Sequence, residues 1–132
     1  MMMTAERVQR IAEPYFRGHD LDALAPDVAS LDVPTGREVQ GREAVAEGML
    51  ADFWGRAFEG GGQLTRTAYA ADGTAVMEFD YVGRHIGTFH GIEATGQTVT
   101  GKVCIVATVG EKHIEREHLY YPLAQILEQL QR

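Results

Sequence analysis

Residues 81–100, YVGRHIGTFHGIEATGQTVT, decide the fold that we expect for this chain. The stretch begins as a strand that carries an imidazole at His85, passes through a glycine-rich crossing, and ends at the Thr-Gly start of another strand. Glycines this dense between strands mark sharp bends and places where backbone or a ligand comes close. The segment therefore predicts two strands joined by a tightly bent crossing.

The same stretch resembles the signature of SnoaL-like polyketide cyclases, a branch of the NTF2-like folds. The match consists of His85, Gly87, Phe89, Gly91-Ile92 and Ala94-Thr95-Gly96, while Glu93 replaces the proline that usually precedes the alanine. The resemblance covers nearly the whole chain and is closest from Tyr81 to Gln129. It implies an α+β cone, in which a curved mixed or antiparallel sheet wraps the N-terminal helices and leaves an internal pocket.

The first half of the chain is predicted to be mainly helical. Apolar residues recur at helical spacing from Val8 to Phe16 after a capping Thr4, and Pro14 predicts a bend or an early end. Residues 28–33 are expected to form a loop and a short strand, and a second helix is predicted over residues 42–59. Gly60–Gly62 would end that helix as the only linker-like segment.

The second half changes to a period of two, which predicts strands. The expected strands cover residues 64–70, 75–85, 98–109 and 113–121, and a short amphipathic helix follows over residues 123–130. This order of elements indicates a single α+β domain spanning residues 1–132.

Composition excludes several classes of function. The net charge of −7 argues against a nucleic-acid-binding surface, which needs clustered Lys and Arg. The single cysteine, Cys104, excludes an internal disulfide and a cysteine-based zinc site. Five scattered histidines show no metal-binding spacing, and the glycines form no dinucleotide-binding motif, so neither a metal nor a cofactor is expected.

Strand alternation assigns side chains to faces of the sheet. Met77, Phe79, Tyr81 and His85 share a parity that should face the helices, unless a bulge near Gly83 reverses it. On the last strand, Ile114, Arg116, His118 and Tyr120 share one face, and Glu115, Glu117, Leu119 and Tyr121 share the other.

The resemblance also identifies where catalysis would be located. The family's last strand ends in a catalytic aspartate, but that position is Pro122 here, and proline cannot transfer a proton. His118 is the candidate replacement base because an imidazole titrates near neutrality, with His85 or Tyr120 as hydrogen-bond donor. A structural role for His118 or His85 remains open. The predicted ligand-binding residues are Tyr15, Trp54, Met77, Phe79, Tyr81 and Arg116.

Two functions are compatible with these residues. The first is a cyclase, isomerase or hydrolase that acts on a small apolar carbonyl compound by cofactor-free acid/base chemistry. The second is a non-catalytic small-molecule-binding protein of the same fold, which the proline at position 122 favours.

Partners and location follow from the same patterns. Strands after Gly96 are apolar on both faces, which predicts a homodimer through the sheet. The N-terminal residues lack a secretory signal pattern, and no apolar run approaches the ~20 residues that span a bilayer, so we expect a cytoplasmic protein without membrane contact.

Overall fold

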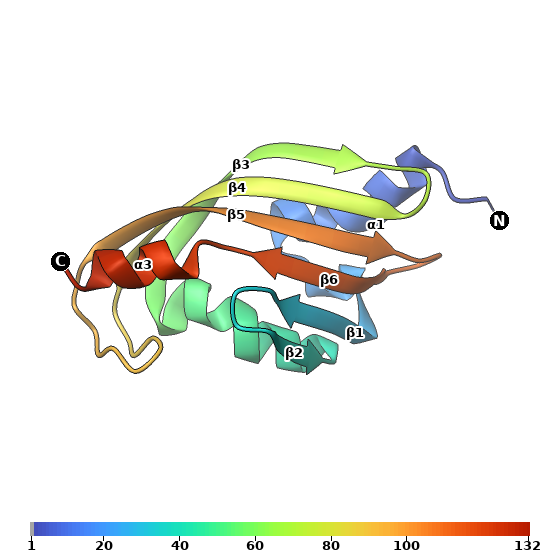
Figure 1. Ribbon diagram of the computed structural model, residues 1–132. Helices are drawn as coiled ribbons and strands as arrows, with labels where there is room; N and C mark the ends of the chain where they lie inside the picture. The colour runs from blue at the N-terminus through green and yellow to red at the C-terminus, as the bar shows by residue number, and fades with distance from the viewer. Residues whose placement is uncertain (1) are drawn as a thin grey trace.

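The computed structural model describes residues 2–132, except for the side chain of Met49. Six strands form one sheet in the order β2-β1-β6-β5-β4-β3, in which β1 and β6 are parallel and all other neighbours are antiparallel. The strands are β1 (Leu24–Asp32), β2 (Arg37–Gln40), β3 (Phe58–Tyr69), β4 (Thr74–His85), β5 (Thr98–Val109) and β6 (Ile114–Tyr120). The predicted α+β architecture with a curved mixed sheet is confirmed (Figure 1).

The helices cover one side of the sheet. Helix α1 (Ala5–Gly18) and the helical segment that begins with α2 (Arg42–Val45) lie together on the concave side, whereas α3 (Leu123–Leu130) lies at the end where β5 begins (Figure 1). The longest helix, α1, has 14 residues, and no helix within residues 2–132 combines the length and apolar character of a membrane-spanning segment.

Helix α1 follows its predicted apolar stripe but does not end early. Its N-cap is Thr4, whose side chain accepts a hydrogen bond from the Arg7 backbone N–H at 3.1 Å. Val8, Ala12, Tyr15 and Phe16 are buried. The helix continues for four residues beyond Pro14 and ends where His19 adopts a left-handed conformation with φ 54°.

The predicted helix over residues 42–59 is shorter and less regular than its apolar pattern indicates. After α2, the chain forms two π-helical segments, η2 (Ala46–Leu50) and η3 (Asp52–Arg56). The helical geometry breaks at Trp54 and Gly55, where Gly55 has φ 137°, a value that favours glycine. Strand β3 then begins at Phe58, so the predicted helix end was wrong by about one turn.

Gly60–Gly62 were predicted to be a linker, and this was wrong because they form part of β3. A Cβ on Gly62 would lie 2.6 Å from the Phe79 ring, and a Cβ on Gly60 would collide with the Tyr81 phenol. Glycine is therefore needed at these two positions because aromatic rings of the neighbouring strand occupy the space of a Cβ, and not because the chain must be flexible there.

This packing predicts opposite effects for two neighbouring glycines. Gly62→Ala should destabilise the protein by about 1–3 kcal/mol, because the added methyl group overlaps a buried ring. Gly61→Ala has no atom within 4 Å of its Cβ and should stabilise the strand by about 0.5–1 kcal/mol. Urea denaturation of both variants measures the difference; a linker would give the same result at both positions.

Candidate functional site

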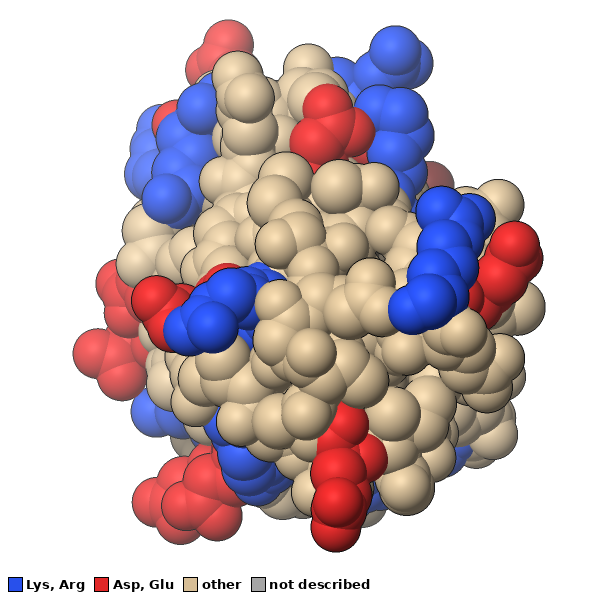
Figure 2. Space-filling view, turned by 90° about the vertical axis from the view of Figure 1, so that its left-hand side faces the viewer, with Lys and Arg blue, Asp and Glu red and all other residues tan. Residues whose placement is uncertain are grey.

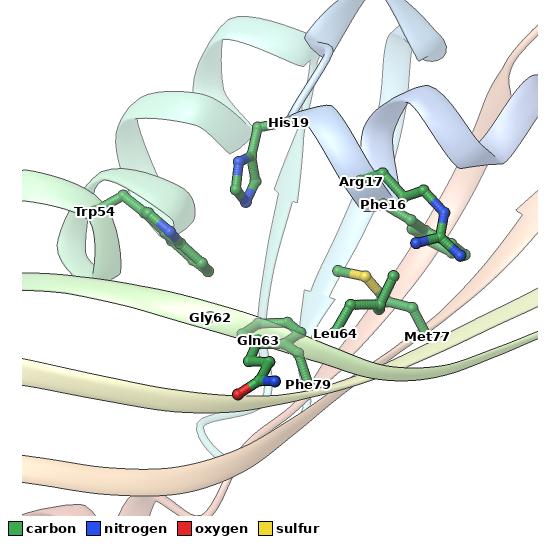
Figure 3. A pocket seen from close by; sticks show the side chains of 9 residues that line it. All are labelled: Phe16, Arg17, His19, Trp54, Gly62, Gln63, Leu64, Met77 and Phe79. Atoms are coloured by element: carbon green, nitrogen blue, oxygen red, sulfur yellow. The ribbon is translucent and has the colours of Figure 1, made fainter.

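Two adjoining cavities lie between the helices and the concave face of the sheet. The outer cavity has a volume of about 340 Å³ and is lined by Phe16, Arg17, His19, Trp54, Gly62, Gln63, Leu64, Met77 and Phe79 (Figure 3). The inner cavity is nearly filled by its own lining, with about 10 Å³ left, and is lined by Leu50, Phe53, Trp54, Phe79, Tyr81, Val103, Ile105, Leu119 and Tyr121. Trp54 and Phe79 belong to both cavities.

Trp54 separates the outer cavity from the inner one. Its ring centroid lies 5.2 Å from that of His19 on the outer side and 5.6 Å from that of Tyr81 on the inner side. Its indole N–H makes no hydrogen bond to any residue that the structure describes. The backbone break at Trp54 and Gly55 turns the indole toward the sheet, where it can contact a ligand in either cavity.

Two tyrosines that line the inner cavity donate their hydroxyl hydrogen bonds to acceptors within the protein. Tyr81 donates a hydrogen bond to the Phe53 carbonyl, and Tyr121 donates one to Asp32 Oδ2 at 2.9 Å. Burial raises the pKa of both phenols, and the nearby Asp32 carboxylate raises that of Tyr121 further. Both phenols therefore stay protonated and serve as donors.

Asp32 is a candidate that the sequence did not reveal. It ends β1, where it pairs with Leu119 of β6, a residue of the inner cavity. Asp32 Oδ1 is buried and has no hydrogen-bond partner among residues 2–132. An unpaired buried carboxylate oxygen is costly for stability, so its presence next to Tyr121, which lines the inner cavity, marks a candidate proton acceptor.

Glu117, which strand alternation placed on the face opposite His118, lies in a buried polar cluster outside both cavities. Tyr15 donates a hydrogen bond to Glu117 Oε1 at 2.7 Å, and Ser30 Oγ donates one to Oε2 at 3.1 Å. Burial raises the pKa of the Glu117 carboxyl, and the two hydrogen bonds offset part of that shift. Tyr15, predicted to bind ligand, thus connects α1 to β6 instead.

His85 lies on the predicted inward face but lines neither cavity. Its Nδ1 accepts a hydrogen bond from the Thr95 backbone N–H at 3.1 Å and lies 3.1 Å from Thr95 Oγ1. Nε2 is buried without a partner in the described chain, and the ring packs against Phe58 at 5.3 Å. The geometry therefore gives His85 the alternative role of holding the glycine-rich crossing.

His118, Tyr120 and Arg116 lie on the outer face of the sheet, which corrects their expected place in the pocket. A bulge between the Val109–Ile114 and Thr108–Arg116 pairs reverses the alternation within β6. Ile114 therefore points inward with Glu117 and Leu119, and the three predicted residues point outward. Arg116 forms an exposed ion pair with Glu38, at 3.9 Å.

The remaining predicted ligand-binding residues meet in one place. Trp54, Met77 and Phe79 line the outer cavity, and Trp54, Phe79 and Tyr81 line the inner one. Their roles stay predictions, but the structure brings them together as expected. Within residues 2–132, no three His, Cys, Asp or Glu side chains are grouped so that they could hold a metal ion.

Comparison with known proteins gives one family and one fold. The family model described as SnoaL-like polyketide cyclase matches residues 7–130. No curated protein sequence matches the chain significantly.

Solved structures with the same fold cover almost the entire chain. A protein from Jannaschia sp. CCS1, provisionally assigned as a SnoaL-like polyketide cyclase, has a TM-score of 0.80 at 14% identity, covering 96% of this chain and 93% of its own. A provisional polyketide cyclase from Xanthomonas campestris pv. campestris has a TM-score of 0.80 at 23% identity, with 96% and 98% covered. An NTF2-like protein from Burkholderia thailandensis E264 has a TM-score of 0.74 at 14% identity, with 99% and 100% covered. At these identities the likeness shows a shared fold.

The buried carboxyl of Glu117 predicts a pH-dependent stability. Its pKa in the folded state is raised above the ordinary value of 4.5. Above pH 4.5 the Glu117 carboxyl of the folded protein therefore keeps its proton more fully than that of the unfolded chain does. Wild-type stability relative to Glu117→Gln should therefore be greatest below pH 4.5 and fall as pH rises through the folded-state pKa. Denaturant titrations of both proteins from about pH 4 to about pH 8, in steps of about 0.5 pH unit, measure this difference. A constant difference across the series would contradict it.

Proposed function

The chain belongs to the SnoaL-like polyketide cyclase family, and we propose that it binds a small apolar carbonyl compound on the concave side of the sheet and moves a proton on it without a cofactor. The proposal covers aldol-type ring closure and isomerisation, because both begin with loss of a proton from the carbon beside a carbonyl. The aromatic lining of the two cavities suits an apolar ligand, as most small-molecule sites are lined in this way.

The observation that carries the proposal is the buried, unpartnered Oδ1 of Asp32. The other oxygen of this carboxylate is held by Tyr121, which lines the inner cavity. The hydrogen bond orients the carboxylate and leaves Oδ1 as its free acceptor. A positioned carboxylate of this kind is a general base.

The proposed step uses residues of this chain alone. The C–H bond beside the ligand carbonyl breaks, its proton goes to Asp32 Oδ1, and the electron pair moves onto the carbonyl oxygen. The unpaired indole N–H of Trp54 donates a hydrogen bond to that oxygen as negative charge develops. The resulting enolate then reacts in one of two ways: its carbon attacks a second carbonyl, whose oxygen takes the proton back from Asp32 as the C–O π bond breaks, or the enolate takes the proton back at another carbon.

Access to Asp32 requires Trp54 to move. The outer cavity holds the free volume, whereas the inner cavity is nearly filled, and Trp54 lies between them. Gly55 follows Trp54 directly with φ 137°, so the backbone at this point has the conformational freedom that such a movement needs.

The second candidate, a non-catalytic binding protein, is favoured by Pro122. Pro122 stands where the family resemblance places the catalytic aspartate, and it precedes α3 with its carbonyl accepting from the Ile126 N–H at 3.0 Å. Its ring lies over Gly101, where a Cβ would be 2.9 Å from Pro122 Cγ. The residue therefore has a structural role, and catalysis would depend on Asp32.

Hydrogen exchange on a model ketone distinguishes the two candidates. The wild-type protein should accelerate the exchange of the acidic protons of 2-tetralone in D₂O, measured by proton NMR. Asp32→Asn should reduce that acceleration by about 10²–10⁴-fold, the contribution of one acid/base group. Asp27→Asn is the matched control, because Asp27 lies on the same strand and is exposed. His118→Gln should also leave the rate unchanged.

An exchange rate equal to that in buffer, with 2-tetralone bound, would establish the binding-protein alternative. Loss of exchange in His118→Gln but not in Asp32→Asn would contradict the assignment of the base.

We also infer a homodimer formed through the outer face of the sheet. Val76, Cys104, Val106 and His118 are half-buried at the centre of this face, and Val82 and Tyr120 are exposed by 51% and 41%. A second copy of the same face would cover these apolar groups.

Sedimentation velocity tests the dimer directly. The wild-type protein should sediment as a dimer at micromolar concentration, and Val106→Glu should produce monomers because it places a charge at the centre of the interface. Ala71→Glu, in the exposed hairpin between β3 and β4, is the control and should remain dimeric. A wild-type monomer would contradict the inference.

A further inference from the structure

The mouth of the outer cavity carries positive charge in an otherwise acidic protein. The chain has 19 acidic and 12 basic residues, and both kinds are interspersed on the face shown in Figure 2, yet the lining of this cavity contains Arg17 and His19 and no Asp or Glu. Resting on the function proposed above, we propose that the ligand carries a carboxylate, which Arg17 and His19 bind at the mouth while its apolar body lies against Trp54 and Phe79.

Arg17 is placed to bind an anion over an apolar floor. Its guanidinium lies above Leu64 and Met77, beside the ring of Phe16 (Figure 3). Its ion partner is Glu13, one turn earlier on α1, at 3.6 Å from Nε, and the two side chains are 57% and 34% exposed. Exposed pairs of this kind contribute little, so a ligand carboxylate can compete for the guanidinium. Arginine binds carboxylates through two parallel hydrogen bonds, which fixes the orientation of the ligand.

His19 supplies the second group from the end of the same helix. It is one of two non-glycine residues with positive φ among residues 2–132, at φ 54°. Glycine fits this helix-ending position with less strain. The left-handed turn aims the imidazole into the cavity between Trp54 and Arg17 (Figure 3). The ring makes no hydrogen bond within the described chain, and its contact is with Trp54, at 5.2 Å.

The rest of the lining sets the chemistry of the ligand body. Phe16, Met77 and Phe79 are buried and, with Trp54, form apolar walls. Gln63 adds no polar group to these walls, because its side chain points to the far side of β3 (Figure 3). The volume of about 340 Å³ lies at the lower end of the range for small-molecule sites. The arrangement fits a compact ring system that bears a carboxylate at one end and a carbonyl at the other, facing Trp54.

This orientation connects the inference to the proposed chemistry. A carboxylate held at the mouth leaves the opposite end of the ligand directed toward Trp54, which borders the inner cavity lined by Tyr121, the hydrogen-bond partner of Asp32. Binding energy at the mouth would thus position the reactive carbon without taking part in the proton transfer.

Calorimetric titration with a matched pair of probes tests the inference. 1-Naphthaleneacetate and 1-naphthaleneacetamide share a body and differ in charge. The wild-type protein should bind the acid about tenfold or more tightly than the amide, the difference expected for a charge-assisted hydrogen bond. Arg17→Gln should abolish this preference and leave amide binding unchanged. Arg10→Gln makes the same charge change on α1 outside the cavity lining and should retain the preference.

Substitutions of His19 provide a second readout. His19→Asn keeps a residue that tolerates the left-handed conformation and should weaken binding of the acid but not of the amide. His19→Gly should do the same while raising the melting temperature, because glycine relieves the backbone strain. Unchanged acid binding in both variants would contradict the assignment of His19.

The carboxylate site and the apolar cavity are distinguished by which probes bind. Equal affinity for acid and amide, or equal weakening of both by Arg17→Gln, would overturn the carboxylate inference and leave the apolar cavity as the proposed site. Failure of both probes to bind would overturn the carboxylate inference and the proposed cavity together.

Discussion

Phe79 and Tyr81 of β4 pack against Gly62 and Gly60 of β3, and the geometry of the concave face depends on this contact. The rings occupy space that a Cβ on either glycine would need. From this position the Tyr81 hydroxyl donates a hydrogen bond to the Phe53 carbonyl, which connects the π-helical segment to the sheet. The same segment carries Trp54, which lies between the outer and inner cavities. Two glycines on an outer strand thus determine where the candidate ligand-binding surface lies.

Periodicity and the glycine-rich stretch predicted much of this fold, because both act through local geometry. The strands from Ala75 to Val109 and the final helix lie where the patterns placed them. Long-range effects were not predictable in the same way. The role of Gly60 and Gly62 depends on rings that come some twenty residues later, and the bulge in β6 reversed the faces of His118 and Tyr120. Asp32 was missed because its significance arises from a parallel pairing with β6 and from Tyr121, neither of which leaves a local signal.

The structure moves the candidate chemistry away from the last strand. His118 lies on the outer face, and Glu117 is satisfied by Tyr15 and Ser30, so neither faces a cavity. Pro122 at the family's aspartate position has a structural role at the start of α3. Arg17 and His19 instead line the outer cavity, Trp54 lines both cavities, and Asp32 is hydrogen-bonded to Tyr121 of the inner cavity. A fold that supplies the pocket can relocate its proton-transfer group from one strand to another, since the reaction needs a single positioned base.

In the function proposed here, the ligand binds on the concave side of the sheet against Trp54, the only tryptophan in the sequence. Acrylamide quenching of its fluorescence, measured with and without saturating 2-tetralone, reports on this binding site because the signal comes from one known residue. Bound ligand should shield the half-buried indole and lower the quenching constant several-fold. An unchanged quenching constant under conditions where calorimetry shows 2-tetralone to be bound would place the ligand elsewhere and contradict the account.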